Sequence, residues 1–156
     1  MSKAALFRIV SRFVLHPWFR LTRGATIGVR AVVIDPEGRV LLVRHSYAPG
    51  WILPGGGVER GETAYAAVRR EVHEEAGIVI EGEPTLHGVF ANHKQFWGDH
   101  LACFLVRRYR QEPFTPTREI AAARFFAPND LPPGTTGGTK RRIAEILNAM
   151  PVTPDW

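Results

Sequence analysis

The sequence predicts a mixed α/β domain built in layers, with a β-sheet in the middle and helices on its outer faces. Three observations lead to this fold class. Short apolar runs with the composition of strands alternate along the chain with two longer helical stretches. The 156 residues are enough for one domain with a proper core and too few for two. A content of 45% hydrophobic and 22% charged residues is ordinary for a soluble globular protein.

The predicted domain begins with two apolar segments that are joined by a turn. Residues 26–34 read as a buried strand, and residues 39–44 read as the strand that returns from it. The residues between them, Asp35, Pro36 and Gly38, are typical of tight turns. We therefore predict that the two strands pair as a hairpin.

A helix is predicted over residues 63–76, after a short strand at residues 51–54 and a glycine-rich loop. The helical stretch contains no proline or glycine, and Gly77 follows it where a left-handed cap is expected. One face can be buried, because apolar residues recur at three- and four-residue spacing at Ala64, Ala67, Val68 and Val72.

The second half of the chain adds more strands and a second helix. Apolar runs predict extended segments at residues 78–80, 84–91, 100–108 and 119–126. Loops are expected at residues 92–99 and 134–139. Residues 140–150 read as a C-terminal helix with Ile143, Ile146 and Leu147 on one face.

Three carboxylates lie near the end of the predicted central helix. Glu71, Glu74 and Glu75 have the spacing i, i+3 and i+4, which places them together on the helix surface. Like charges at this spacing repel by roughly 0.2–0.5 kcal/mol per pair. A hard divalent cation such as Mg²⁺, which prefers oxygen ligands, would remove that repulsion. The alternative from these residues alone is a solvated acidic face, with Arg70 able to reach Glu74.

The stretch from Gly56 to Ile78 resembles the signature of the Nudix hydrolases. That signature reads Gly, five residues, Glu, seven residues, then Arg-Glu-apolar-x-Glu-Glu-x-Gly-apolar. Its fixed positions are all filled at the correct spacing, by Gly56, Glu62, Arg70, Glu71, Val72, Glu74, Glu75, Gly77 and Ile78. The resemblance extends over roughly residues 28–150 and implies a Nudix-type α/β/α sandwich with a central mixed β-sheet.

The resemblance implies a metal-dependent pyrophosphohydrolase that cleaves a nucleoside diphosphate linked to another moiety, by attack of water on phosphorus. The implied cofactor is Mg²⁺ or Mn²⁺. The implied catalytic residues are Glu71, Glu74 and Glu75, which ligate the metal, and Arg70, which orients one of these carboxylates. The backbone carbonyl of Gly55 is a further candidate metal ligand.

The general base stays open between a glutamate of the signature and a carboxylate from a distant loop. Outside the signature, the candidates are Glu119, Asp99 and His100. Glu62 is expected to have a structural role in closing the loop onto the helix.

Substrate binding requires cations for phosphate groups and aromatic rings on which a base can stack. We predict that Arg44 and the loop residues Gly55 and Gly56 bind the phosphates, and that Phe96 and Trp97 contact the base. The other candidates are the cations Arg30, Arg70 and Lys94, the rings Tyr47 and Trp51, and the imidazoles His45 and His93.

Two alternatives remain beside a hydrolase of small nucleotides. One is a non-catalytic Nudix module that senses a nucleotide, although such modules normally lack a carboxylate of the signature and this chain has all three. The other is an RNA 5′-pyrophosphohydrolase, which the basic N-terminal arm keeps open.

The first 24 residues form a basic arm outside the predicted Nudix domain, which we place at residues 25–150, before a short tail at 151–156. The net charge is +5, and no acidic residue precedes Asp35. The arm is interpreted as a helix packed on the domain or on a second subunit, which leaves a homodimer open. The alternatives are an amphipathic segment on a membrane surface, a targeting presequence and a nucleic-acid-binding arm.

Cys103 is the only cysteine and lies in an apolar, strand-like run. A buried, inert thiol is therefore expected, and no disulfide can form within the chain. No apolar run approaches the ~20 residues of a membrane-spanning helix. Together these observations favour a cytoplasmic protein. The family resemblance implies that its partner is a small-molecule nucleotide or a nucleotide-linked substrate.

Overall fold

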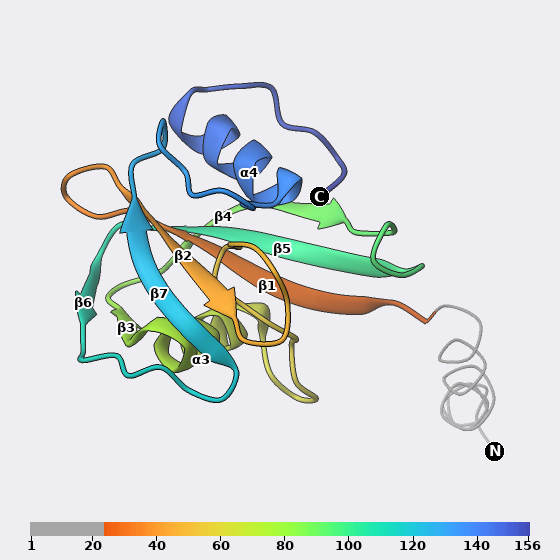
Figure 1. Cartoon of the computed structure of the whole chain (residues 1–156). Coiled ribbons are helices and arrows are strands. Elements are labelled where there is room, and N and C mark those ends of the chain that lie inside the picture. The colour runs from red at the N-terminus through yellow and green to blue at the C-terminus, as the bar shows by residue number, and fades with distance from the viewer. Residues whose placement is uncertain (1–23) are drawn as a thin grey trace, which may run out of the picture.

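The computed structural model describes residues 24–156, so the predicted basic arm lies outside the described residues except for Gly24. The strands form a middle layer (Figure 1). Helix α3 (Ala64–Ala76) covers one face of this layer, and helix α4 (Gly137–Leu147) covers the other. The predicted α/β/α sandwich is confirmed.

The middle layer contains a mixed sheet of three strands in the order β1, β5, β4. Strand β1 (Thr26–Val33) runs parallel to β5 (Asp99–Val106). Strand β5 runs antiparallel to β4 (Thr85–Ala91). The mixed sheet that the family resemblance implies is therefore present.

The predicted hairpin between residues 26–34 and 39–44 is wrong. Strand β2 (Val40–His45) pairs antiparallel with β7 (Ile120–Phe126), far along the chain. A single bridge between Ile34 and Val40 is the only pairing beside the turn. The strands separate because β1 is buried on both faces and finds its partner in β5, while β2 finds its partner in β7.

The alternation of side chains along β1 divides the core into two parts. Val29, Ala31 and Val33 pack against α3, with Val68 and Val72 of that helix. Val32 faces the other way and joins a second cluster, which contains Phe90 and Cys103 of the sheet and Ile143 of α4. Cys103 is buried as expected, and burial raises the pKa of its thiol to about 12, which makes the thiol unreactive.

Helix α3 begins and ends where the sequence predicts. The hydroxyl of Thr63 accepts a hydrogen bond from the Ala66 N–H at 3.1 Å, which caps the N-terminus. Gly77 adopts a left-handed conformation, with φ of 67°, and its N–H donates to the His73 carbonyl at 2.8 Å. These caps hold the carboxylate-bearing helix at a defined length.

Helix α4 begins three residues earlier than predicted, and part of the expected loop at residues 134–139 belongs to it. The Thr136 carbonyl accepts the N–H of Lys140 at 3.0 Å, so the helix begins with two glycines. It also ends earlier, at Leu147, because Ala149 adopts a left-handed φ of 49°.

Two short strands complete the middle layer. Strand β3 (Ile78–Ile80) pairs antiparallel with β6 (Tyr109–Gln111). Strand β6 falls within a stretch that the sequence leaves as a link, because three residues carry too little periodicity to predict a strand. Within residues 24–156, no helix is long and apolar enough to cross a membrane.

Candidate functional site

The glycine-rich loop is fixed by hydrogen bonds to strands on both sides of it. Residues 51–58 run from the edge of β2 to the edge of β1 that β5 leaves free. Ile52 exchanges two hydrogen bonds with Val43 of β2, at 2.9 and 3.0 Å. Further along, the Gly56 carbonyl accepts the N–H of Val29 at 2.8 Å. The loop therefore acts as an extended bridge between the three-stranded sheet and the β2–β7 pair.

Other parts of the chain approach the backbone closely at two glycines of this loop, and at Gly55 only glycine fits. Gly55 has a φ of 142°, and a Cβ there would collide with the backbone of Val29 and Arg30. A Cβ on Gly56 would lie 2.5 Å from a carboxylate oxygen of Glu71. The absence of side chains lets a carboxylate of α3 reach the loop backbone.

Glu75 is the buried carboxylate of the site. Its Oε2 accepts the Gly55 N–H at 2.8 Å, and its Oε1 lies 3.4 Å from Nε2 of His45. Burial raises the pKa of Glu75 to about 7, although the Gly55 N–H and the charge of Arg30 oppose that shift. Burial also lowers the pKa of His45, with the charge of Arg30 as the next cause.

Arg70 is the cation among the other carboxylates of the signature. It donates to both oxygens of Glu62 at 3.0 Å, and its Nη1 lies 2.7 Å from Glu71 and 3.4 Å from Glu74. A further bond of 3.1 Å joins Nη2 to the Gly57 carbonyl. These hydrogen bonds to carboxylates raise the pKa of Arg70. Arg70 thereby ties the glycine-rich loop to α3.

The donors at this site fit a hard divalent cation. Glu71 and Glu75 lie one turn apart on α3 and both reach the loop. The Gly55 carbonyl accepts Arg30 Nη1 and keeps a second lone pair. Mg²⁺ is commonly held by one or two carboxylates together with substrate phosphates. Arg70 engages Glu71 and Glu74, and no three acidic, histidine or cysteine side chains in the described part of the chain form a ready-made metal cluster.

A cavity of about 790 Å³ lies beside the glycine-rich loop and the side chains of Glu71 and Glu75. It brings together five of the site residues that the sequence predicts, namely Gly55, Gly56, Glu71, Glu75 and Phe96. Other lining residues that the argument below uses are Arg30, His45, Glu119, Gly138, Thr139 and Trp156. This volume suits a ligand of nucleotide size.

Four of the predicted site residues do not line this cavity. Arg70 and Glu74 lie beside it, and the Glu74 side chain is 58% exposed. Arg44 is exposed, with its guanidinium 5.5 Å from the centre of the Trp51 ring. Trp97 is 87% exposed and stacks on His93.

Arg30 is the cation that lines the cavity, whereas the sequence favours Arg44. Its guanidinium donates to the carbonyls of Leu53, at 3.2 Å, and Gly55. Burial lowers the pKa of Arg30, and Glu75 and Glu71 oppose that shift. The signal in the sequence that could have favoured Arg30 is its position as a charged residue in the middle of the apolar run at residues 26–34. A strand of this composition is expected to be buried, so its one arginine is not expected to be fully solvated.

The three candidates for a general base differ in how their side chains are used. Asp99 is buried and accepts hydrogen bonds from Thr26 and Asn92, both at 2.7 Å, so both of its oxygens are engaged. His100 does not line the cavity, and its Nδ1 lies 3.1 Å from the Gly98 carbonyl. Glu119 lines the cavity and is exposed to it.

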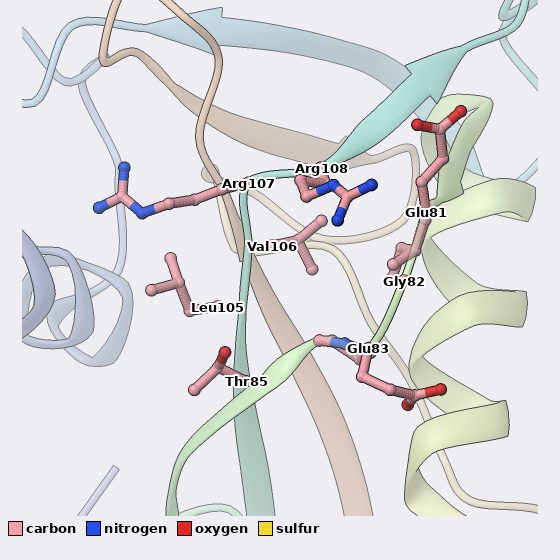
Figure 2. A pocket seen from close by; sticks show the side chains of 10 residues that line it. Glu81, Gly82, Glu83, Thr85, Leu105, Val106, Arg107 and Arg108 are labelled. Atoms are coloured by element: carbon pink, nitrogen blue, oxygen red, sulfur yellow. The ribbon is translucent and has the colours of Figure 1, made fainter.

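A second, smaller hollow of about 180 Å³ lies between residues 80–85 and 105–108 (Figure 2). Figure 2 shows the Arg107 side chain pointing away from that of Arg108, and the Glu83 carboxylate pointing away from both. This hollow contains no residue of the predicted site. We therefore base the functional argument on the larger cavity.

In the metal-free protein, Glu75 is expected to make the free energy of unfolding depend on pH. Its pKa is 4.5 in the unfolded reference and about 7 in the folded chain. Between pH 4.5 and pH 7, Glu75 is largely deprotonated in the unfolded state and still protonated in the folded state. The free energy of unfolding of the metal-free protein is therefore expected to fall over this range, by on the order of 2–3 kcal/mol. Urea unfolding in EDTA at pH 5 and 7.5 measures this fall.

The matched variants for this measurement are Glu75→Gln and Glu74→Gln. The free energy of unfolding changes with pH in both proteins. The difference between wild type and Glu75→Gln in this change isolates the contribution of the Glu75 carboxyl group from that of other titrating groups. Glu74→Gln should keep the wild-type pH dependence, because Glu74 is exposed. An identical pH dependence in wild type and Glu75→Gln would refute the assignment.

Comparison with known proteins agrees with the geometry. A family model described as the NUDIX domain matches residues 24–146. A putative 8-oxo-dGTP diphosphatase from Bacillus subtilis (strain 168) is 30% identical over 123 residues, covering 79% of this chain and 80% of that protein. A MutT-like protein from Streptomyces ambofaciens is 42% identical over 67 residues, and the chain covers only 43% of its length.

A solved structure has the same fold. The crystal structure of a MutT NUDIX hydrolase from Burkholderia pseudomallei superposes with a TM-score of 0.68 at 30% sequence identity. The match covers 78% of this chain and 98% of that protein. The fold, the signature and the family model therefore agree.

Proposed function

Because the chain belongs to the Nudix hydrolase family, we propose that it hydrolyses the phosphoric anhydride bond of a nucleoside diphosphate linked to another moiety, with Mg²⁺ or Mn²⁺ as cofactor. One observation carries the proposal. Glu71 and Glu75 of one helix meet the glycine-rich loop at the wall of a cavity that also contains Arg30.

The residues proposed to hold the cation are Glu71, Glu75 and the Gly55 carbonyl, with Glu74 as an additional carboxylate at the rim. When bound, a divalent cation neutralises phosphate oxygens and lowers the pKa of water, so that hydroxide is available at neutral pH. Arg70 positions Glu71 through their 2.7 Å contact and positions the loop through the Gly57 carbonyl.

The other cavity residues have roles that follow from their chemistry. Arg30 and His45 are proposed to bind substrate phosphates, because their polar groups lie beside Glu75 at the loop. Phe96 is half-exposed at the cavity and offers a ring for the base. Glu119 is the proposed general base, because its carboxylate lines the cavity and makes no side-chain hydrogen bond within residues 24–156.

We place this activity in the cytoplasm. The support is the free, buried thiol of Cys103 and the absence of any other cysteine, which suit a reducing compartment.

Activity against a panel of candidate substrates tests the proposal. The panel contains nucleoside triphosphates, ADP-ribose, dinucleoside polyphosphates, sugar nucleotides and 5′-triphosphorylated RNA, each with Mg²⁺, with Mn²⁺ and with EDTA. Release of phosphate, pyrophosphate or a nucleoside monophosphate is expected for at least one substrate and should be lost in EDTA. Absence of turnover with every substrate and both metals would contradict the proposal.

A further inference from the structure

The last residues of the chain form part of the domain, although the sequence suggests only a short tail at 151–156. Asp155 forms a parallel bridge with Ala91 at the end of β4. The Ala91 N–H donates to the Pro154 carbonyl at 2.9 Å, and the Trp156 N–H donates to the Ala91 carbonyl at 2.8 Å. The segment therefore extends the edge of the three-stranded sheet next to α4 (Figure 1).

A buried ionic cluster holds this segment against α4. Arg142 is completely buried, and its Nη2 donates to Glu145 at 2.6 Å and to the Thr153 hydroxyl at 2.7 Å. Glu145 also accepts the Thr153 N–H at 3.0 Å, and its other oxygen lies 2.9 Å from Nε2 of His87. Nε of Arg142 makes no hydrogen bond within residues 24–156. Because burying charges costs free energy, the pairing of the Arg142 and Glu145 charges with each other and with Thr153 favours one geometry of the segment.

The Trp156 indole packs between α4 and β4. The Arg142 guanidinium lies 3.7 Å from the centre of the Phe90 ring and 5.7 Å from that of Trp156. On the other side, a Cβ at Gly138 would collide with Nε1 of the indole and lie 2.6 Å from its Cδ1. Glycine at position 138 is therefore required for the indole to lie against the first turn of α4.

Trp156 is only partly buried in this position, and it lines the large cavity together with Gly138 and Thr139. These residues belong to the α4 side of the sheet, whereas Glu71 and Glu75 belong to α3 on the opposite side (Figure 1). The two ends of an elongated ligand would thus be contacted from different layers.

We propose that Trp156 is a substrate-binding residue, whose indole forms a wall on which the base of the nucleotide packs. This inference rests on the proposed function, because it concerns the part of the same substrate that is not hydrolysed. An indole offers a large, flat apolar surface at low cost in conformational entropy, and stacking on it tolerates different bases.

Kinetics of Trp156→Ala and Trp156→Phe test this role with the best substrate of the panel. Loss of a stacked base is expected to raise KM roughly 10-fold or more in Trp156→Ala while kcat stays within about two-fold. Trp156→Phe should retain most of the affinity, since phenylalanine keeps a ring. Met150→Ala is the control, because Met150 is exposed outside the cavity and belongs to no proposed site.

Gly138→Ala tests the same role without removing the indole. The new methyl group should displace Trp156 and raise KM as Trp156→Ala does, while alanine favours the helix. Gly137→Ala is its control, because a Cβ there meets only a flexible Arg141 nitrogen at 3.4 Å. Comparison of Gly138→Ala with Gly137→Ala tests whether the Trp156 indole contacts the base, even if Trp156→Ala fails to fold.

Nucleotide binding separates this inference from the proposed function. If the wild type hydrolyses no substrate, the proposed function fails, and quenching of tryptophan fluorescence by ATP or ADP-ribose with Mn²⁺ then tests Trp156 directly. Quenching that is lost in Trp156→Phe supports the inference. Unchanged KM in both Trp156→Ala and Gly138→Ala, or no nucleotide-dependent quenching in an inactive wild type, overturns it.

Discussion

Replacing Glu71 by glutamine is expected to lower the kcat of metal-dependent hydrolysis by on the order of 10²–10³-fold, the usual effect of removing one group that stabilises transition-state charge. Glutamine keeps the shape of the side chain that lies against Gly56 but lacks the negative charge that a cation requires. Steady-state rates with saturating Mg²⁺ or Mn²⁺ measure the loss.

Circular dichroism and thermal unfolding provide the control for this variant, because the fold should survive an isosteric change. Glu81→Gln is the matched substitution, since Glu81 is exposed and outside the large cavity. Glu74→Gln tests whether the exposed third carboxylate also takes part, and a large loss of activity is expected if it does. Full activity of Glu71→Gln would remove Glu71 from the catalytic residues.

Replacing Arg70 by alanine is expected to lower both stability and activity. The change removes five hydrogen bonds that join the loop, Glu62 and the carboxylates of α3, and leaves Glu71 without a partner. After allowance for solvent screening, the cost is about 2 kcal/mol, or a Tm lower by about 4–8 °C for a domain of this size. Calorimetry gives the stability, and the rate assay gives the activity.

Two further variants identify the cause of this loss. Arg70→Lys keeps the positive charge but cannot bind both oxygens of Glu62, so an intermediate effect is expected. Arg110→Ala removes an ion pair with Glu112 in which both side chains are exposed, so its Tm should stay within about 2 °C of the wild type. A Tm for Arg70→Ala equal to that of Arg110→Ala would show that Arg70 has no structural role.

The helix that carries the candidate metal ligands could be predicted from the sequence because its defining residues lie on one short stretch. Thr63 and Gly77 set the ends of a helix by local rules, and the helical repeat then fixes the spacing of Glu71, Glu74 and Glu75. None of these relations requires a contact with a distant part of the chain. For this reason the helix and the family signature agree with the structure almost residue by residue.

The cation of the cavity was harder to predict, because which face a strand side chain occupies depends on its partners. Arg44 and Arg30 are both arginines in predicted strands. Only the pairing of β1 with β5 and with the glycine-rich loop places Arg30 at the carbonyls of Leu53 and Gly55. Arg44 instead lies over Trp51, on the surface.

By itself, the sequence determined the layered fold and the helix that carries the carboxylates, since these follow from local spacing and periodicity. It determined the hydrolase family through its resemblance to the Nudix signature. Only the tertiary structure decided that β1 and β2 have distant partners and that Trp156 reaches the cavity. The physical reason is that strand pairing and the contact of His87 with Glu145 are long-range events. Their free energy comes from segments that meet only when the chain is folded.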